Sequence, residues 1–166
     1  MKKIILGLFV FGLTIQSFAQ VIELPEVEIV AVNYKYLDNV GEPASAQSVK
    51  LLKREADAFD LKNSEYYENQ YDDYFISFYI PQGKILASYD KEGNVLRTVE
   101  KYKNIALPPA VSKAIVKNYS DWKIAENAYL VNYHDRKGAT KKENKILLEK
   151  GNRQMRVKTD ENGNIL

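Results

Sequence analysis

Cysteine is absent from the 166 residues, and histidine and tryptophan each occur once. Without cysteine the chain can form no disulfide, no thiolate metal site, no iron–sulfur centre and no thiol nucleophile. The single histidine, His134, is accompanied by no Gly-x-Ser-x-Gly motif, so its position predicts an exposed histidine at the end of a strand rather than a hydrolase base. We therefore expect no catalytic residue, no bound metal and no cofactor.

Long apolar runs are also lacking, apart from one between Ile4 and Ile15. This run is shorter than the roughly 20 residues that a membrane-spanning helix needs. Two lysines precede it and the small-x-small step Ser17-Phe18-Ala19 follows it, which is the pattern of a secretory signal peptide over residues 1–19. We expect a periplasmic or secreted protein that begins at Gln20 and has no stable membrane span after cleavage; a retained anchor is the alternative.

Charge is nearly balanced over the chain but unevenly distributed along it. Residues 20–90 hold 13 acidic and 6 basic residues, whereas residues 91–166 hold 9 acidic and 16 basic residues. The asymmetry predicts either two solvated surfaces that attract each other weakly or a basic face for an anionic partner. Nucleic acid is not expected as that partner, because the chain is exported and its lysines form no dense block.

The first half of the mature chain predicts an arm, a helix and a meander. Alternating apolar residues over 21–38 predict a strand whose start, at Pro25, lies at a sheet edge or in an extended arm. Apolar residues at spacings of three and four over 44–61 predict an amphipathic helix with Lys53 among its polar residues. The segments 74–80, 84–89 and 95–102 alternate and are separated by turn residues, so they predict an antiparallel meander.

The second half repeats this order of elements. Residues 107–119 predict a helix whose apolar stripe includes Val116. The segments 122–133, 144–149 and 155–159 predict strands, and the polar residues 134–142 predict a loop.

A short sequence motif occurs once in each half of the chain. Asp90-x-x-Gly93-Asn94 recurs seventy residues later as Asp160-x-x-Gly163-Asn164, and the sequence predicts the same hairpin turn at both places. Asp160, Asn162 and Asn164 have the first spacings of a calcium loop, but the glycine is misplaced for one. We therefore expect an α+β fold, a tandem repeat of a helix plus an antiparallel β-meander with the helices packed on one face of the sheet. The expected parts are an arm over 20–43 and repeats over 44–104 and 105–166.

Three motifs carry a resemblance to a known family: Gly83-Lys84-Ile85-x-Ala87 with the turn that follows it, Leu107-Pro108-x-x-Val111, and Trp122-x-Ile124. With them, residues 60–166 resemble the PepSY-like family of small exported proteins from Bacteroidetes-type bacteria. That family is likened in fold to the β-lactamase inhibitor protein, and PepSY domains take their name from the propeptides of thermolysin-like peptidases. The resemblance implies a binding or inhibitory module.

Tyrosine is abundant, with twelve in the chain. The tyrosines predict either core and cross-strand packing or a recognition face. The strand over 74–80 carries bulky residues on both faces, and a sheet covered by helices on one side has no second core for the other set. We therefore predict protein-binding residues on an open sheet face, with Phe75, Tyr79 and Tyr89 as the candidates.

These observations predict an exported, non-enzymatic module that binds or inhibits an envelope protein or peptidase. One alternative is a structural accessory of an outer-membrane complex, which donates the segment VIELPEVEIV as a strand to a partner. The other is an enzyme of unrecognised type. The acidic cluster Glu65, Glu68, Asp72 and Asp73 could pair carboxylates for acid–base chemistry, but its tyrosine neighbours favour a solvated segment near a sheet edge.

Overall fold

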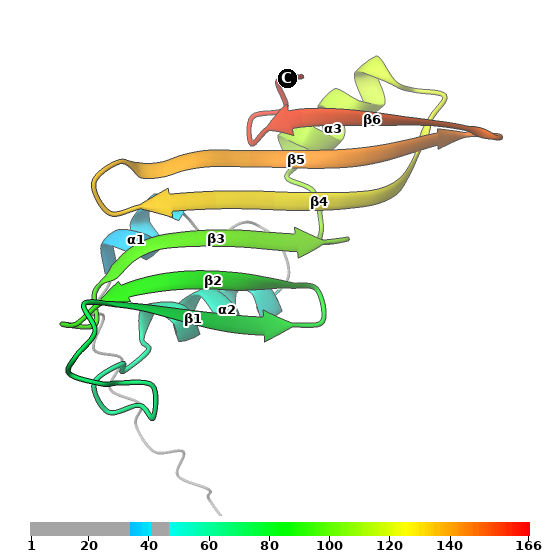
Figure 1. The fold of residues 1–166 in the computed structure, drawn as a ribbon. Helices are drawn as coiled ribbons and strands as arrows, with labels where there is room; N and C mark the ends of the chain where they lie inside the picture. The colour runs from blue at the N-terminus through cyan, green and yellow to red at the C-terminus, as the bar shows by residue number, and fades with distance from the viewer. Residues whose placement is uncertain (1–33, 41–46) are drawn as a thin grey trace, which may run out of the picture.

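The computed structural model describes residues 34–40 and 47–166, which form three helices and six strands. The helices are α1 (Tyr34–Val40), α2 (Gln47–Asp57) and α3 (Pro109–Asn118), and the strands are β1 (Asp73–Ile80), β2 (Gly83–Asp90), β3 (Val95–Lys103), β4 (Lys123–His134), β5 (Gly138–Lys150) and β6 (Arg153–Asp160). The strands form one antiparallel sheet in chain order, β1 to β6 (Figure 1).

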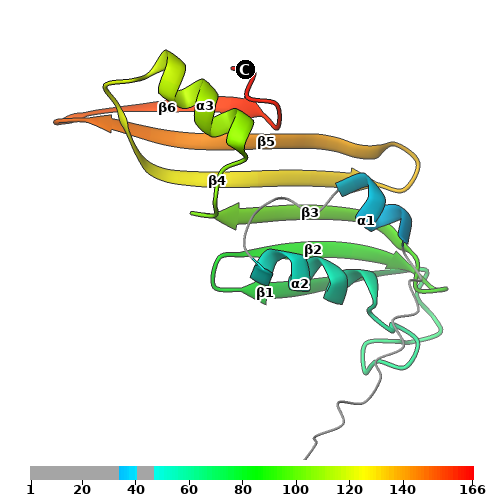
Figure 2. The same ribbon diagram turned by 180° about the vertical axis from the view of Figure 1, so that it is seen from behind.

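The three described helices lie on the same face of this sheet, and no described element covers the other face, which we call the open face (Figure 2). Helices α1 and α2 cover a large core over β1 to β4, and α3 covers a smaller one over β5 and β6. The smaller core contains Val111, Ile115, Ile146, Leu148 and Val157. The predicted α+β class with helices on one face of an antiparallel sheet is therefore confirmed.

The prediction of a strand that continues to residue 38 is wrong, because α1 begins at Tyr34. Within α1, Tyr36 and Val40 lie four residues apart on one side of the helix, and both are buried against the sheet. Residues 1–33 lie outside the described residues, and with them the predicted signal peptide and the segment proposed for strand donation.

The prediction of a loop over 134–142 is also largely wrong, because β5 begins at Gly138. Lys141 and Lys142 pair with Asn132 and Val131 of β4. The loop was predicted from the polar character of these residues. A strand beside an open sheet face can carry polar side chains, so polarity alone did not distinguish the two.

Lys53 of α2 was expected on the polar side of its helix, but its side chain is only 1% exposed. It lies on the buried stripe of α2 with Val49, Leu52 and Ala56. In α3 the error is the reverse one. Val116 was predicted to lie on the buried apolar stripe, but its side chain is 68% exposed. Each helix is thus rotated slightly from the orientation that its apolar residues alone predict.

Glu100 of β3 is the partner of Lys53 and is fully buried. One carboxylate oxygen, Oε2, lies 3.3 Å from the Lys53 ammonium and accepts a hydrogen bond of 2.8 Å from the Tyr102 hydroxyl. The other oxygen, Oε1, accepts hydrogen bonds from Tyr36 (2.8 Å) and Thr98 (3.1 Å). Burial and the charge of Glu100 raise the pKa of Tyr36, which keeps its hydroxyl a donor. The Glu100 network joins α1 and α2 to the sheet.

The two repeated turns have the same internal hydrogen bonds, which agrees with the prediction of the same turn at both places. In the first, Asp90 Oδ1 accepts from the amides of Glu92 (3.0 Å) and Asn94 (2.8 Å), and Asp90 Oδ2 accepts from Asn94 Nδ2 (2.9 Å). Gly93 has a φ of 90°. This turn joins β2 to β3.

The second turn repeats these contacts between Asp160 and the residues Asn162 and Asn164, at 2.7 to 2.9 Å. It leads from β6 to Ile165, which forms a bridge with Thr159. The hydrogen bonds from Asn164 lower the pKa of Asp160. Because the carboxylate binds its own loop, the calcium-like spacing is that of a hairpin turn, as predicted.

Replacing Gly93 by alanine should lower the free energy of unfolding by about 1 kcal/mol, since a residue with a Cβ is strained at this positive φ. Replacing Gly163 by alanine should cost more. Its φ is 86°, and an added Cβ would lie 2.6 Å from the Ala110 carbonyl oxygen of α3, whereas around Gly93 the nearest atom is 4.0 Å away. Urea unfolding of both variants measures the difference. Equal losses in the free energy of unfolding would show that α3 can move away from the added Cβ without loss of stability.

Candidate protein-binding face

The open face of the sheet carries every second residue of each strand, because side chains alternate between the two faces. On β1 to β3 these residues include four exposed apolar side chains, which we call the open-face patch: Phe75 (71% exposed), Tyr79 (66%), Val99 (54%) and Leu86 (40%). Leu86 pairs directly with Val99, and Tyr79 pairs with Lys84. Phe75 and Tyr79 are therefore exposed on the open face, where the sequence placed them.

Tyr89 is not on this face, and its selection as an anchor was wrong. Its side chain is fully buried beneath α2, where its hydroxyl donates a hydrogen bond of 2.6 Å to the Ala56 carbonyl oxygen. Burial raises its pKa. The reason is strand parity, since Ile85, Ala87 and Tyr89 share one side of β2 and the first two are core residues.

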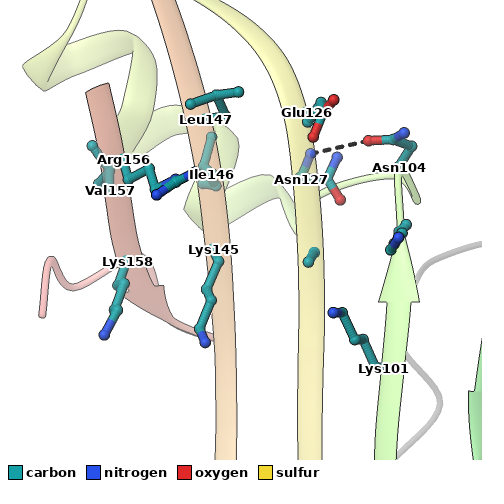
Figure 3. A pocket seen from close by; sticks show the side chains of 12 residues that line it. Lys101, Asn104, Glu126, Asn127, Lys145, Ile146, Leu147, Arg156, Val157 and Lys158 are labelled. Atoms are coloured by element: carbon teal, nitrogen blue, oxygen red, sulfur yellow. Dashed lines mark hydrogen bonds between the residues drawn. The ribbon is translucent and has the colours of Figure 1, made fainter. Parts of the chain in front are cut away.

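The other half of the open face, over β3 to β6, is basic. Here the register aligns Lys103, Ala128, Lys145 and Lys158 in one row across four strands. The row crosses a hollow of about 280 Å³, which we call the cationic hollow. Figure 3 shows Lys101, Lys145 and Lys158 extending from β3, β5 and β6. The lining residues are Lys101, Lys103, Asn104, Glu126, Asn127, Ala128, Lys145, Ile146, Leu147, Arg156, Val157 and Lys158.

Glu143 neutralises part of this charge beside the hollow. Its carboxylate lies 3.1 Å from Lys141 Nζ and 3.4 Å from Lys145 Nζ. Burial acts to raise the pKa of Glu143, but the two lysines outweigh it and the pKa is lowered. Within the described residues no carboxylate lies within ion-pair distance of Lys101, Lys103, Arg156 or Lys158, so four of the five lining cations face the hollow without such a partner.

Two asparagines fix the rim of the hollow where β3 ends. The Asn127 amide donates to Asn104 Oδ1 (3.0 Å, dashed in Figure 3), and the Asn104 amide donates to the Asn127 carbonyl oxygen (2.9 Å). Asn127 Nδ2 also donates to the Ile105 carbonyl oxygen at 3.0 Å. Asn104 has a φ of 51°, which asparagine tolerates better than most residues. The β3 lysines are therefore held at a fixed backbone position.

Chemistry-bearing side chains elsewhere do not converge in the part of the chain that the structure describes. His134 ends β4, as predicted, but is partly buried, and its Nδ1 lies 2.7 Å from Asp135 Oδ1. The acidic cluster Glu65, Glu68, Asp72 and Asp73 is exposed on the segment that leads into β1 and at the first residue of that strand. Over residues 34–40 and 47–166 no three His, Cys, Asp or Glu side chains are placed to hold a metal ion. None of the described helices has the length and apolar character needed to cross a membrane.

The comparisons with known proteins find a distant likeness among solved structures. No protein-family model matches the chain, and no curated protein matches it. Among solved structures, the chain is similar to a BLIP-like protein from Bacteroides fragilis, with 18% identity and a TM-score of 0.34 over 78% of this chain and 88% of that chain. The proposals for this chain therefore depend on its own residues.

Proposed function

We propose that the chain is an exported, non-enzymatic module that binds an envelope protein or peptide through the open face of its sheet. The observation that carries this proposal is the open-face patch, where four apolar side chains at least 40% exposed gather on three neighbouring strands. Contiguous exposed apolar side chains are typical of interaction sites. Tyrosine and phenylalanine are also enriched in protein interfaces, where they act as rigid anchors.

The proposal includes export by the signal peptide over residues 1–19, with a periplasmic or secreted location. It also includes membership of the PepSY-like family and a tandem repeat. Two features support the repeat: a helix followed by three antiparallel strands occurs twice, as α2 to β3 and as α3 to β6, and the two repeated turns share their hydrogen bonds. Inhibition of a peptidase is one form that such binding could take.

A non-enzymatic role is supported by the placement of the polar groups. The largest buried set, around Glu100, is enclosed between the helices and the sheet and is fully hydrogen-bonded within the fold. The open face, which a substrate could reach, offers mainly apolar and cationic side chains. Such a surface can bind a partner, but over residues 34–40 and 47–166 it presents no nucleophile paired with a base.

Site-specific photo-crosslinking in the native cells tests the proposal. A photoreactive phenylalanine analogue replaces Tyr79 on the open face or, as a matched control, Val116 on α3, since the two side chains are 66% and 68% exposed. We expect a discrete adduct from position 79 and none from position 116. The intact mass of the recovered protein also shows whether the chain begins at Gln20, as export with cleavage requires. Adducts of equal yield from both positions would contradict binding through the open face.

The double substitution Phe75→Ala and Tyr79→Ala should reduce the yield of that adduct when the crosslinker stands at Leu86 instead. Its free energy of unfolding should stay within about 1 kcal/mol of the wild-type value, as is usual for surface substitutions. Unchanged adduct formation in a folded double variant would remove the two aromatic residues from the interface.

A further inference from the structure

We propose that the partner contacts the cationic hollow with an acidic peptide segment, in which Asp or Glu residues adjoin apolar ones. This inference rests on the proposed function and specifies the chemistry of the partner. It is carried by the hollow's charge, by the spacing of its lysines and by its apolar floor.

The charge of the hollow favours an anionic occupant. Five basic residues line it and only one acidic residue, Glu126, does so. Glu143 pairs with Lys145 at the border, which leaves an excess of positive charge from Lys101, Lys103, Arg156 and Lys158. Like-charged groups gathered on one surface attract a partner of opposite sign and disfavour others. The hollow also holds part of the basic excess in the second half of the sequence, for which a basic face was one of two interpretations.

The spacing of the lysine row fits a short extended peptide. Lys103 and Lys158 stand three strand intervals apart in one register row, which is about 14 Å at about 4.8 Å for each interval. In an extended peptide, residues i and i+4 are about 13 Å apart on the same side. Acidic residues at positions i and i+4 of a peptide that crosses the strands would therefore lie near Lys103 and Lys158, the two ends of the row.

The floor of the hollow distinguishes a peptide from a phosphate polymer or a nucleic acid. Ala128 and Leu147 lie between the basic residues, and Lys101 pairs with Leu130. Leu130 is partly buried and lies beside the strand that carries Val99 of the open-face patch. Apolar side chains of a peptide would cover these surfaces, whereas phosphates would leave them wet. No aromatic residue lines the hollow, so it lacks the stacking platform that single-stranded nucleic acids use.

Fluorescence anisotropy with the mature chain tests the inference. The probe is a labelled ten-residue peptide that alternates valine and glutamate, and the comparison probe alternates valine and glutamine. The triple variant Lys101→Gln, Lys103→Gln and Lys158→Gln removes three cations of the hollow. The matched control, Lys91→Gln, Lys113→Gln and Lys117→Gln, removes three exposed cations from the β2–β3 turn and from α3.

We expect the glutamate peptide to bind more tightly than the glutamine peptide, and we expect its affinity to fall as the salt concentration is raised. The hollow variant should bind it about tenfold more weakly, which corresponds to the modest contributions of three exposed charge pairs. The control variant should bind it as the wild type does. Equal losses in both variants, or equal binding of the two peptides, would overturn the inference.

Two further probes cover the other possible occupants. Tighter binding of inorganic polyphosphate or of a single-stranded oligonucleotide than of the glutamate peptide would overturn a peptide partner. Tighter binding of a peptide with the sequence of residues 21–32, which holds three glutamates and no base, would assign the hollow to the chain's own arm and overturn an external partner. An adduct from position 79 without binding of the glutamate peptide would refute only the charge inference, whereas peptide binding without that adduct would refute only the proposed interface.

Discussion

Replacement of Glu100 by alanine should lower the free energy of unfolding by about 3–5 kcal/mol, because it removes one member of a buried ion pair. The carboxylate accepts hydrogen bonds from Tyr36, Thr98 and Tyr102, and it lies beside the buried ammonium of Lys53. All four groups would lose this acceptor at once. Lys53→Met should cost less, since Glu100 would keep its three hydroxyl donors and methionine would fill a similar volume.

Urea unfolding of Glu100→Ala, Lys53→Met and a control, Glu92→Ala, measures this order. Glu92 lies exposed in the β2–β3 turn, and its substitution should change the free energy of unfolding by less than about 0.5 kcal/mol. A loss below about 1 kcal/mol in Glu100→Ala would mean that the network contributes little to stability. If Lys53→Met lowered the free energy of unfolding more than Glu100→Ala, the contacts of Lys53 would contribute more to stability than those of Glu100.

Tyr79 and Tyr89 were both selected as binding residues from the sequence, but their replacement by alanine should have very different effects on the free energy of unfolding. Tyr89→Ala should cost about 3–5 kcal/mol, because it empties a fully buried site under α2. Tyr89→Phe should cost about 1 kcal/mol through loss of the hydrogen bond to Ala56. Tyr79→Ala, at a side chain that is 66% exposed, should stay within about 0.5 kcal/mol of the wild type. Denaturant midpoints measured in parallel check the contrast, which would be refuted if Tyr79→Ala were the more destabilising change.

Local patterns predicted most of the fold. The turn residues before Gly83 and around Gly93 set the ends of β1, β2 and β3, and alternation between these turns set the strands themselves. The repeated motif around Asp160 predicted a second turn of the same kind as the first, and the two turns share their internal hydrogen bonds. These features depend on residues within a few positions of one another, so a single sequence contains them.

Features that depend on distant partners were missed. Lys53 and Glu100 are 47 positions apart, and each is polar, so neither was placed in the core. The spacing along each element could have indicated their burial. Lys53 follows the buried Val49 by four positions in a helix, and Glu100 lies on the same side of its strand as Thr98 and Tyr102. The start of β5 was missed because its residues are polar and form a strand by pairing with β4, which the local sequence does not indicate. In each case tertiary context overrode the local preference.

The candidate site was found in part for the same reasons. Alternation within β1 was enough to select Phe75 and Tyr79. The same alternation, applied to β2 with Ile85 and Ala87 as core residues, would have excluded Tyr89. The cationic hollow could not be predicted, because the row of Lys103, Lys145 and Lys158 exists only once the register of four strands is known.

The order of the strands in the sheet bears on how this chain reaches its fold. Every strand pairs with the next one along the chain, and the only connection longer than a tight turn within the sheet passes through α3. Most strand pairs therefore join residues that are close in sequence, which gives the sheet a low contact order for a β structure. Chains of low contact order fold faster than those dominated by non-local pairings. Each hairpin can form on the edge of the one before it, so the sheet can grow strand by strand without threading.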